Sequence, residues 1–181
     1  MEDVAEAVER HKGDLVAVFY THGHSDHMAD VGLLKEAFDV PIWSASPTAD
    51  RILKDGDVLA LGNQEWTVLH TPGHHPEHLC LLSDSGLVAG DMVAGIGTIL
   101  IPPHQGDMMT YIEQLERLLD LDPHLIFPSH GPVIPLPHRT LEHYIRHRSI
   151  RHDKVLAAVE QGLSKLEEIA KVAYEDTPDA H

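Results

Sequence analysis

The sequence predicts a mixed α/β protein in which helices pack on sheets. Short apolar runs typical of strands alternate with segments of helical periodicity in the first part of the chain, and several strand-like runs follow one another in the middle. At 181 residues the chain fits one domain, and 43% of its residues are hydrophobic, which is enough to form a core.

The expected elements follow from this periodicity. Residues 15–20 form an unbroken apolar run, typical of a strand that is covered on both faces. Asp107 is expected to cap a helix, and Ser164 with Glu167 matches a capping box. The other expected elements are a helix over 1–12, a helix over 31–38, a strand over 40–43, a β-hairpin of strands 57–61 and 66–70, strands 78–83 and 87–90, a loop over 92–106, a helix over 107–119, a strand over 125–127, a long helix over about 138–161 and a helix over 166–174.

The charge and the cysteine content limit the possible functions. Thirteen basic and 29 acidic residues give a net charge of −16, which argues against broad nonspecific binding to nucleic acid or to an anionic membrane. The single cysteine, Cys80, permits no intrachain disulfide and lies in an apolar run, where burial is expected. With no apolar stretch long enough to span a bilayer and no signal-peptide pattern, we expect a cytoplasmic protein that does not bind membranes.

Four candidate metal ligands lie within six residues. Such a density of imidazoles and carboxylates indicates a cation that organises them. Three further candidates follow in loop-like contexts. Taken alone, His130 would more often be a capping or surface residue and Asp91 a turn residue. The candidates are His22, His24, Asp26 and His27 in the cluster, then His74 after Thr71-Pro-Gly, Asp91 after Gly90, and His130 between Ser129 and Gly131.

These ligands divide into two sites. His22, His24 and His74 give a site of three histidines, while Asp26, His27 and His130 give a second one, with Asp91 as the bridge between them. Two divalent cations about 3.5–4 Å apart can activate a shared water as hydroxide and stabilise both the attacking and the leaving oxygen. Asp26 and Asp91 are therefore the catalytic candidates, because Asp26 could orient the hydroxide or pass its proton onward.

Two questions about the ligands stay open at this point. The spacing does not exclude His75 as the ligand in place of His74. His75 and His78 are otherwise expected to lie either next to the ligands or at the surface. The ligand types favour zinc and also admit iron or manganese.

The motifs resemble those of the metallo-β-lactamase superfamily, in the same order along the chain. They are Thr21 to His27, Thr71 to His74, Gly90-Asp91 and Ser129 to Gly131. The resemblance implies a hydrolase with an αββα sandwich. Asp91 with His130 is similar to the glyoxalase II and nuclease branches. The segment Phe127 to Ile134, followed by Tyr144 to Arg148 and Arg151, is more similar to the β-lactamase-like subfamily that includes a mitochondrial endoribonuclease.

The resemblance also implies a division of the chain. Residues 1–137 correspond to the catalytic domain, and residues 138–181 to a partial winged-helix-like segment. Superfamily members usually carry several strands before the histidine cluster, whereas here the cluster begins at residue 22. We therefore expect a sandwich that lacks the N-terminal strands, with an exposed apolar edge that could form a homodimer.

The segment 138–152 is locally basic. Tyr144, Arg146, Arg148 and Arg151 are the candidate substrate-binding residues, with Arg139 nearby, and they could hold a phosphodiester or the carboxylates of a glutathione thioester. The alternative is a solvated helix face paired with acidic residues. The expected function is a dinuclear metal-dependent hydrolase that acts on an ester, thioester or phosphodiester of a small molecule or of RNA. A metal-binding but inactive chain and a nucleic-acid-binding module are the competing hypotheses.

Overall fold

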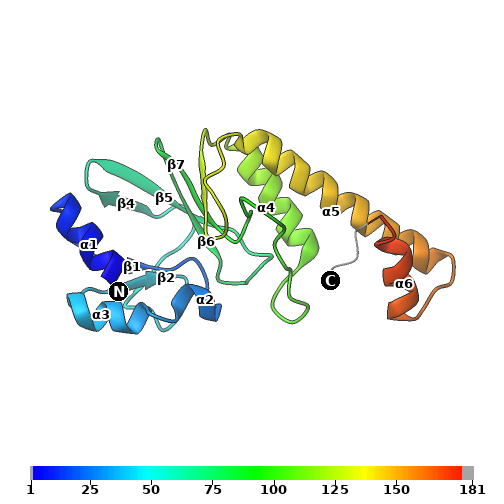
Figure 1. Ribbon diagram of the computed structural model, residues 1–181, viewed down its shortest axis with the longest axis horizontal. Coiled ribbons are helices and arrows are strands. Elements are labelled where there is room, and N and C mark those ends of the chain that lie inside the picture. Colours follow the sequence, from blue (N-terminus) through cyan, green and yellow to red (C-terminus); the bar gives the residue numbers. More distant parts are fainter. Residues whose placement is uncertain (1, 177–181) are drawn as a thin grey trace.

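The computed structural model describes residues 2–176, which form two sheets with helices on either side (Figure 1). The elements are α1 (Glu2–His11), β1 (Val18–Phe19), α2 (Ser25–Met28), α3 (Val31–Phe38), β2 (Ile42–Ser44), β3 (Arg51–Ile52), β4 (Val58–Leu61), β5 (Gln64–His70), β6 (Leu79–Ser83), β7 (Gly86–Gly90), α4 (Met108–Asp120), β8 (Ile126–Pro128), α5 (Pro137–Glu160) and α6 (Leu166–Ala173).

The two sheets differ in size and in strand direction. The first sheet has the order β1-β2-β3 and is parallel throughout. The second has the order β4-β5-β6-β7-β8 and is antiparallel except for the parallel pair β7–β8. The expected hairpin is confirmed: Leu61 pairs with Gln64 across the two-residue turn Gly62-Asn63, and Gly62 has a positive φ of 63°.

Strand β6 lies between two hydrophobic layers, which explains its unbroken apolar run. Leu79 and Leu81 belong to a cluster that also contains Phe19 and Trp43 of the first sheet. Cys80, buried as expected, belongs to the opposite cluster, which includes buried side chains of α4 and α5. The layers are therefore helix, sheet, sheet and helix, as the resemblance implies.

Helix α4 begins at its expected cap. The Asp107 carboxylate accepts a hydrogen bond of 2.7 Å from the backbone N–H of Thr110. The helix packs on the second sheet beside α5, whose Leu141 and Tyr144 lie in the same core cluster. The first turns of α5 therefore pack into the same hydrophobic core as the second sheet and α4, which precede residue 137 in the chain. Helix α6 packs against α5.

Two expected local features are absent. The run over residues 15–20 forms only the two-residue strand β1, and Val16 is 53% exposed. Val18 and Phe19 of β1 are only partly buried, so the run is not covered on both faces. Among the described strands β1 pairs with β2 alone, which makes it an edge strand. The capping box at Ser164 does not form either. Helix α6 has Lys165 as its N-cap without a side-chain cap, and the Lys165 ammonium bonds Glu168 instead.

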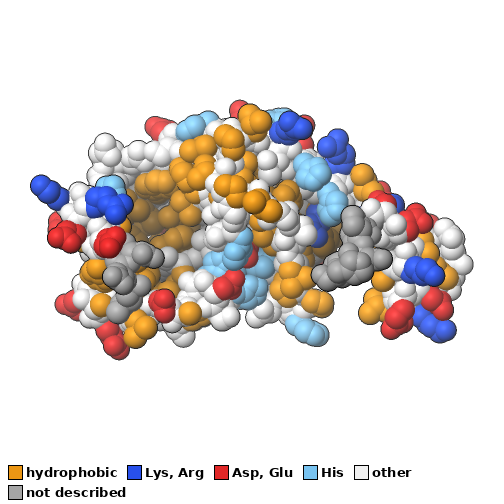
Figure 2. All heavy atoms as spheres, in the orientation of Figure 1, with side chains coloured by type: hydrophobic (Ala, Val, Ile, Leu, Met, Phe, Trp, Pro, Cys, Tyr) orange, Lys and Arg blue, Asp and Glu red, His pale blue; other side chains and the backbone are white. Residues whose placement is uncertain are grey.

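Apolar side chains remain exposed along the sheet edges. Val16, Ile52 and Val58 are each at least half exposed, beside or on β1, β3 and β4. Figure 2 shows hydrophobic side chains gathered in a hollow over the second sheet. The homodimer that we expect from such an edge stays a prediction. Within residues 2–176, no helix combines the length and the hydropathy that a membrane span requires.

Candidate metal centre

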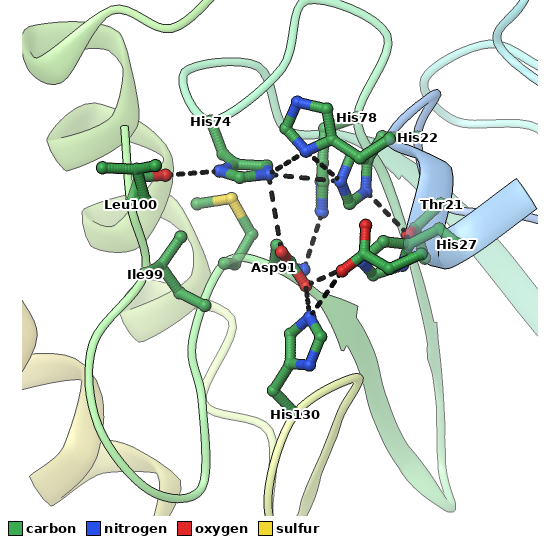
Figure 3. A network of polar contacts seen from close by, with 12 residues as sticks. Thr21, His22, His27, His74, His78, Asp91, Ile99, Leu100 and His130 are labelled. Atoms are coloured by element: carbon green, nitrogen blue, oxygen red, sulfur yellow. Dashed lines mark hydrogen bonds and ion pairs between the residues drawn. The ribbon is translucent and has the colours of Figure 1, made fainter. Parts of the chain in front are cut away.

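The candidate ligands come from four separate segments of the chain that meet at the ends of the strands (Figure 3). His22 and His24 follow β1, and Asp26 and His27 lie on the single turn of α2. The remaining three sit just past the ends of strands: His74 follows β5, Asp91 follows β7 and His130 follows β8. Loops at strand ends are where such folds place their sites, so the sequence pattern and the topology agree.

Three imidazole nitrogens, one each from His22, His24 and His74, form a triangle in this site. His22 Nε2 lies 3.0 Å from His24 Nδ1 and 3.1 Å from His74 Nε2, and the last two atoms are 3.0 Å apart. His75 stays outside the triangle, since its Nδ1 accepts a hydrogen bond from the Glu77 backbone N–H. The structure therefore brings His74, and not His75, to His22 and His24.

The outer nitrogens of the same rings show where the protons are. His74 Nδ1 donates to the Leu100 carbonyl at 2.7 Å, and His24 Nε2 donates to Gln105 Oε1 at 3.1 Å. Each outer nitrogen must carry the hydrogen, so in the neutral rings the inner nitrogens are bare. Bare nitrogens 3.0 Å apart repel each other unless a cation lies between them. A tetrahedral zinc with Zn–N bonds of about 2.0–2.1 Å needs a similar nitrogen spacing, about 3.3 Å, so the triangle fits a metal ion.

Asp91 lies between this triangle and the second group of candidates. Its Oδ2 is 3.5 Å from His74 Nε2, while its Oδ1 is 3.3 Å from His27 Nε2 and 3.4 Å from His130 Nε2. Asp26 Oδ2 approaches the same two rings, at 3.4 Å from His130 and 3.7 Å from His27. The two sets of three that the sequence suggests are thus both assembled, with Asp91 in contact with each.

Burial and neighbouring charges shift the pKa values of these groups. Burial, with the neighbouring histidines, lowers the pKa of His22 to about 2, and burial also lowers the pKa of His74. The Asp91 carboxylate raises the pKa of His27. Burial by itself would raise the pKa of Asp91, but the contact with His27 and the surrounding imidazoles outweigh it and lower that pKa. His22 and His74 are therefore held in the neutral form and Asp91 in the ionised form, which are the forms that bind metal.

Two buried atoms of the centre have no hydrogen-bond partner among the described residues. They are His27 Nε2 and Asp91 Oδ1, which face each other at a separation of 3.3 Å. Unpaired buried polar atoms are costly and rare in folded proteins. Like the triangle, this pair fits a bound cation.

A chain of buried hydrogen bonds behind the ligands holds Asp91. The Asp91 backbone N–H donates to His78 Nε2 at 3.0 Å, so His78 Nδ1 carries the proton and donates to Thr71 Oγ1 at 2.7 Å. Thr71 Oγ1 lies 3.3 Å from Cys80 Sγ, which in turn donates to the Ala89 carbonyl at 3.5 Å. His78 is fully buried, and burial keeps its pKa well below 6.5. His78 and Thr71 thus act beside the ligands, which excludes the surface alternative for His78.

The candidate substrate-binding residues do not share one environment. The Tyr144 hydroxyl accepts from the Ala94 backbone N–H at 3.0 Å and is buried. Arg148 donates to Thr98 Oγ1 at 2.8 Å and to the Ile99 carbonyl. Arg151 donates to the Ala173 carbonyl and to Asp176, tying α5 to α6. Arg146 differs from all three, because it lines a surface pocket.

A signal for these different environments was present in the sequence. Residues 141, 144, 148 and 151 follow a spacing of three or four, so they lie on one face of a helix. Because Leu141 and Tyr144 are in the core, Arg148 and Arg151 continue the inward face.

Comparison with known proteins identifies the family. A model of the metallo-beta-lactamase superfamily matches residues 1–64 and 46–130, and the chain belongs to this superfamily. It is 30% identical to the beta-lactamase-like protein 2 homolog of Drosophila melanogaster, over 97% of this chain and 66% of that protein. It is 35% identical to a hydroxyacylglutathione hydrolase of Bdellovibrio bacteriovorus, over 70% of this chain and 53% of that protein.

A solved structure has the same fold. A metallo-beta-lactamase family protein from Thermus thermophilus superimposes with a TM-score of 0.77 over 96% of this chain and 74% of that one, at 18% identity. The chain spans about half to two thirds of the length of the two relatives named above.

Proposed function

We propose that this chain is a metal-dependent hydrolase with a dinuclear centre that acts on an ester or thioester. The observation that carries the proposal is the convergence of ligand atoms. Three imidazole nitrogens lie 3.0–3.1 Å apart, and those of His24 and His74 carry no hydrogen. Beside them, the buried atoms His27 Nε2 and Asp91 Oδ1 have no hydrogen-bond partner among the described residues. Neutral imidazoles and an ionised carboxylate in that arrangement have little use except to bind cations.

In this proposal each ion has its own set of ligands. His22, His24 and His74 would hold one ion, and Asp26, His27 and His130 the other. Asp91, with contacts from separate oxygens to each set, would bridge them. Two such ions lower the pKa of water between them and stabilise the oxygens that carry charge during hydrolysis. The donor set favours zinc and also suits iron or manganese.

The protein side chains have separable roles in this hydrolysis. Asp91 is buried and ionised, which suits a fixed bridge. The Asp26 side chain is 57% exposed at the open side of the centre, next to His130, where a carboxylate can take up a proton from water and release it to solvent. The contact from the Leu100 carbonyl fixes the His74 ring, as carbonyls behind metal-binding histidines commonly do.

Similarity to a hydroxyacylglutathione hydrolase supports a thioester as the substrate. A phosphodiester is the second candidate, favoured by Arg139 and Arg146 of α5, which line a surface pocket. A substrate panel on protein reconstituted with a defined metal distinguishes the two. We expect thioester hydrolysis well above that of an Asp91→Ala control, and slower cleavage of RNA and of generic phosphodiesters.

The panel also tests the competing hypotheses. If reconstituted protein exceeded the Asp91→Ala control on none of the thioesters, lactones or phosphodiesters, the chain would be a metal-binding protein without this activity. Faster cleavage of RNA than of any thioester would reassign the substrate class.

A further inference from the structure

A surface pocket of about 500 Å³ opens between the start of α5 and two loops, each of which follows a candidate ligand in the chain. One loop follows Asp91 and contributes Ala94 and Gly95. The other follows His130 and contributes Pro132 to Leu136. The Gly95 backbone N–H donates to the His130 carbonyl at 2.8 Å, so one of the residues that line the pocket is hydrogen-bonded to a candidate ligand.

Gly95 is what allows these loops to meet. A Cβ at this position would lie 2.1 Å from the Pro132 carbonyl oxygen, closer than any real contact. The absence of a side chain therefore brings the two loops together, and the pocket lies against the ligand-bearing segments.

The α5 side of the pocket is basic. Arg139, Thr140, His143 and Arg146 line it. Figure 2 shows basic side chains and histidines over α5 on the same face as the central histidine cluster. Arg139 and Arg146 are seven residues apart, which is about 10.5 Å along a helix and nearly two full turns, so they point to the same side. Their guanidinium groups can contact two anionic groups of one ligand.

These two arginines differ from the other five in the chain. Arg10 and Arg117 form ion pairs, and Arg51, Arg148 and Arg151 stack on aromatic rings. Within residues 2–176, the side chains of Arg139 and Arg146 make no hydrogen bond, ion pair or ring contact, although the chain has 29 acidic residues. Glu142, between them on α5, contacts His138 at 3.4 Å.

We propose that the Arg139–Arg146 pocket binds the carboxylates of a small acidic substrate, whose scissile group then reaches the metal centre. This inference rests on the proposed hydrolase function and specifies its substrate class. Arginine is the side chain best suited to paired contacts with carboxylates. The exposed Val133 and Leu136 add an apolar wall for the carbon skeleton of such a ligand. A net charge of −16 and only two unpartnered arginines within residues 2–176 favour a small acid over a nucleic acid, which needs many cations along its length.

The test combines binding with kinetics on metal-reconstituted full-length protein. Isothermal titration with S-hexylglutathione, a stable thioether with two carboxylates, measures binding without turnover. Kinetics compare an acyl-glutathione with the uncharged thioester of the same acyl group on N-acetylcysteamine. The variant is Arg139→Gln with Arg146→Gln. Arg10→Gln with Arg51→Gln is the control, because it removes the same charge from residues outside the pocket.

We expect the pocket variant to weaken binding of S-hexylglutathione at least tenfold and to raise KM for acyl-glutathione similarly, with kcat nearly unchanged. The uncharged thioester and the control variant should show less than a twofold change. Equal losses on both thioesters, equal losses in the control, or no binding by the wild type would overturn the proposal.

The same data separate this inference from the proposed function. Hydrolysis of acyl-glutathione by the wild type that is insensitive to the pocket variant would leave the hydrolase standing and refute the pocket. Binding of S-hexylglutathione that depends on the two arginines, without hydrolysis of acyl-glutathione, would support the pocket and refute the hydrolase. Titration with a short single-stranded RNA is the third arm, and tighter arginine-dependent binding of RNA than of S-hexylglutathione would refute the small-acid assignment.

Discussion

The backbone N–H of Asp91 donates to the ring of His78 at 3.0 Å, and this bond fixes the residue that contacts both sets of candidate ligands. His78 lies thirteen residues before Asp91, directly before β6, the strand next to β7, and both of its ring nitrogens are engaged in hydrogen bonds. The position of the proposed bridge therefore depends on a histidine that does not bind metal.

Substitution of His78 tests this dependence. His78→Leu keeps most of the volume but removes the acceptor, and it should lower the affinity for the second metal roughly 10–100-fold, the usual effect of losing a partner behind a ligand. His78→Gln places an oxygen near the Nε2 position and should retain most of that affinity. Metal titration of both variants measures the difference. Equal affinities in His78→Leu and the wild type would show that the bond is incidental.

The backbone conformation of Gly90 allows the hydrogen bond between the Asp91 N–H and the His78 ring. Its φ is +51°, and a Cβ there would lie 2.5 Å from His78 Nε2. Gly62, with a φ of +63° in the open hairpin turn, is a matched control, because a Cβ at that position would meet no atom within 4 Å. Gly62→Ala should cost about 1–2 kcal/mol of unfolding free energy, from the left-handed backbone alone. Gly90→Ala should cost roughly 1–3 kcal/mol more, from the clash. Urea unfolding measures both, and equal losses would contradict the clash.

The metal-free protein should become less stable as pH falls from about 7.5 to about 5.0. Burial lowers the pKa values of His22, His74 and His78 in the folded chain, while the unfolded chain titrates at about pH 6.5. Below that pH the unfolded chain binds protons that the folded chain does not, so the unfolding free energy falls. His27 acts in the opposite sense, because its raised pKa favours the folded chain at low pH, but it is a single group. Urea midpoints measured in chelator at both values check the sign, and a midpoint that rises toward the lower pH would refute it.

Arg148 should contribute to stability and metal binding, whereas Arg146 should not. Arg148 bonds Thr98 and the Ile99 carbonyl in the loop whose Leu100 carbonyl fixes His74. Arg148→Gln should cost about 1–3 kcal/mol of unfolding free energy and weaken metal binding. Arg146→Gln, in the surface pocket on the same helix, should leave the melting temperature unchanged. Thermal unfolding of both variants separates the two roles, and equal melting temperatures would contradict them.

Much of the fold follows from local patterns in the sequence. The hairpin at Gly62-Asn63 and the Asp107 cap depend on a few neighbouring residues, and both form as expected. The prediction that residues 15–20 are covered on both faces was wrong, because burial depends on which helices and sheets pack against the run, and the local sequence does not contain that information.

The candidate site also contains residues that the sequence predicts and residues that it does not. The ligand candidates are recognisable because chemistry restricts them to histidine and aspartate at strand ends, and the structure brings all seven together. The role of His78 was harder to predict, because the local sequence does not distinguish His78 from His75. Only the pairing of β6 with β7 brings the His78 ring to the backbone N–H of Asp91. The arginines of α5 were grouped by charge, although helical periodicity separates Arg148 from Arg146.

The central claim is that the seven side chains bind two metal ions with Asp91 between them. Metal content per chain, measured on reconstituted wild type and on Asp91→Ala after removal of loosely bound ions, tests this most directly. We predict about two ions per wild-type chain and about one per Asp91→Ala chain, because the variant removes the bridge and its compensating charge. Fewer than one ion per wild-type chain would contradict the account.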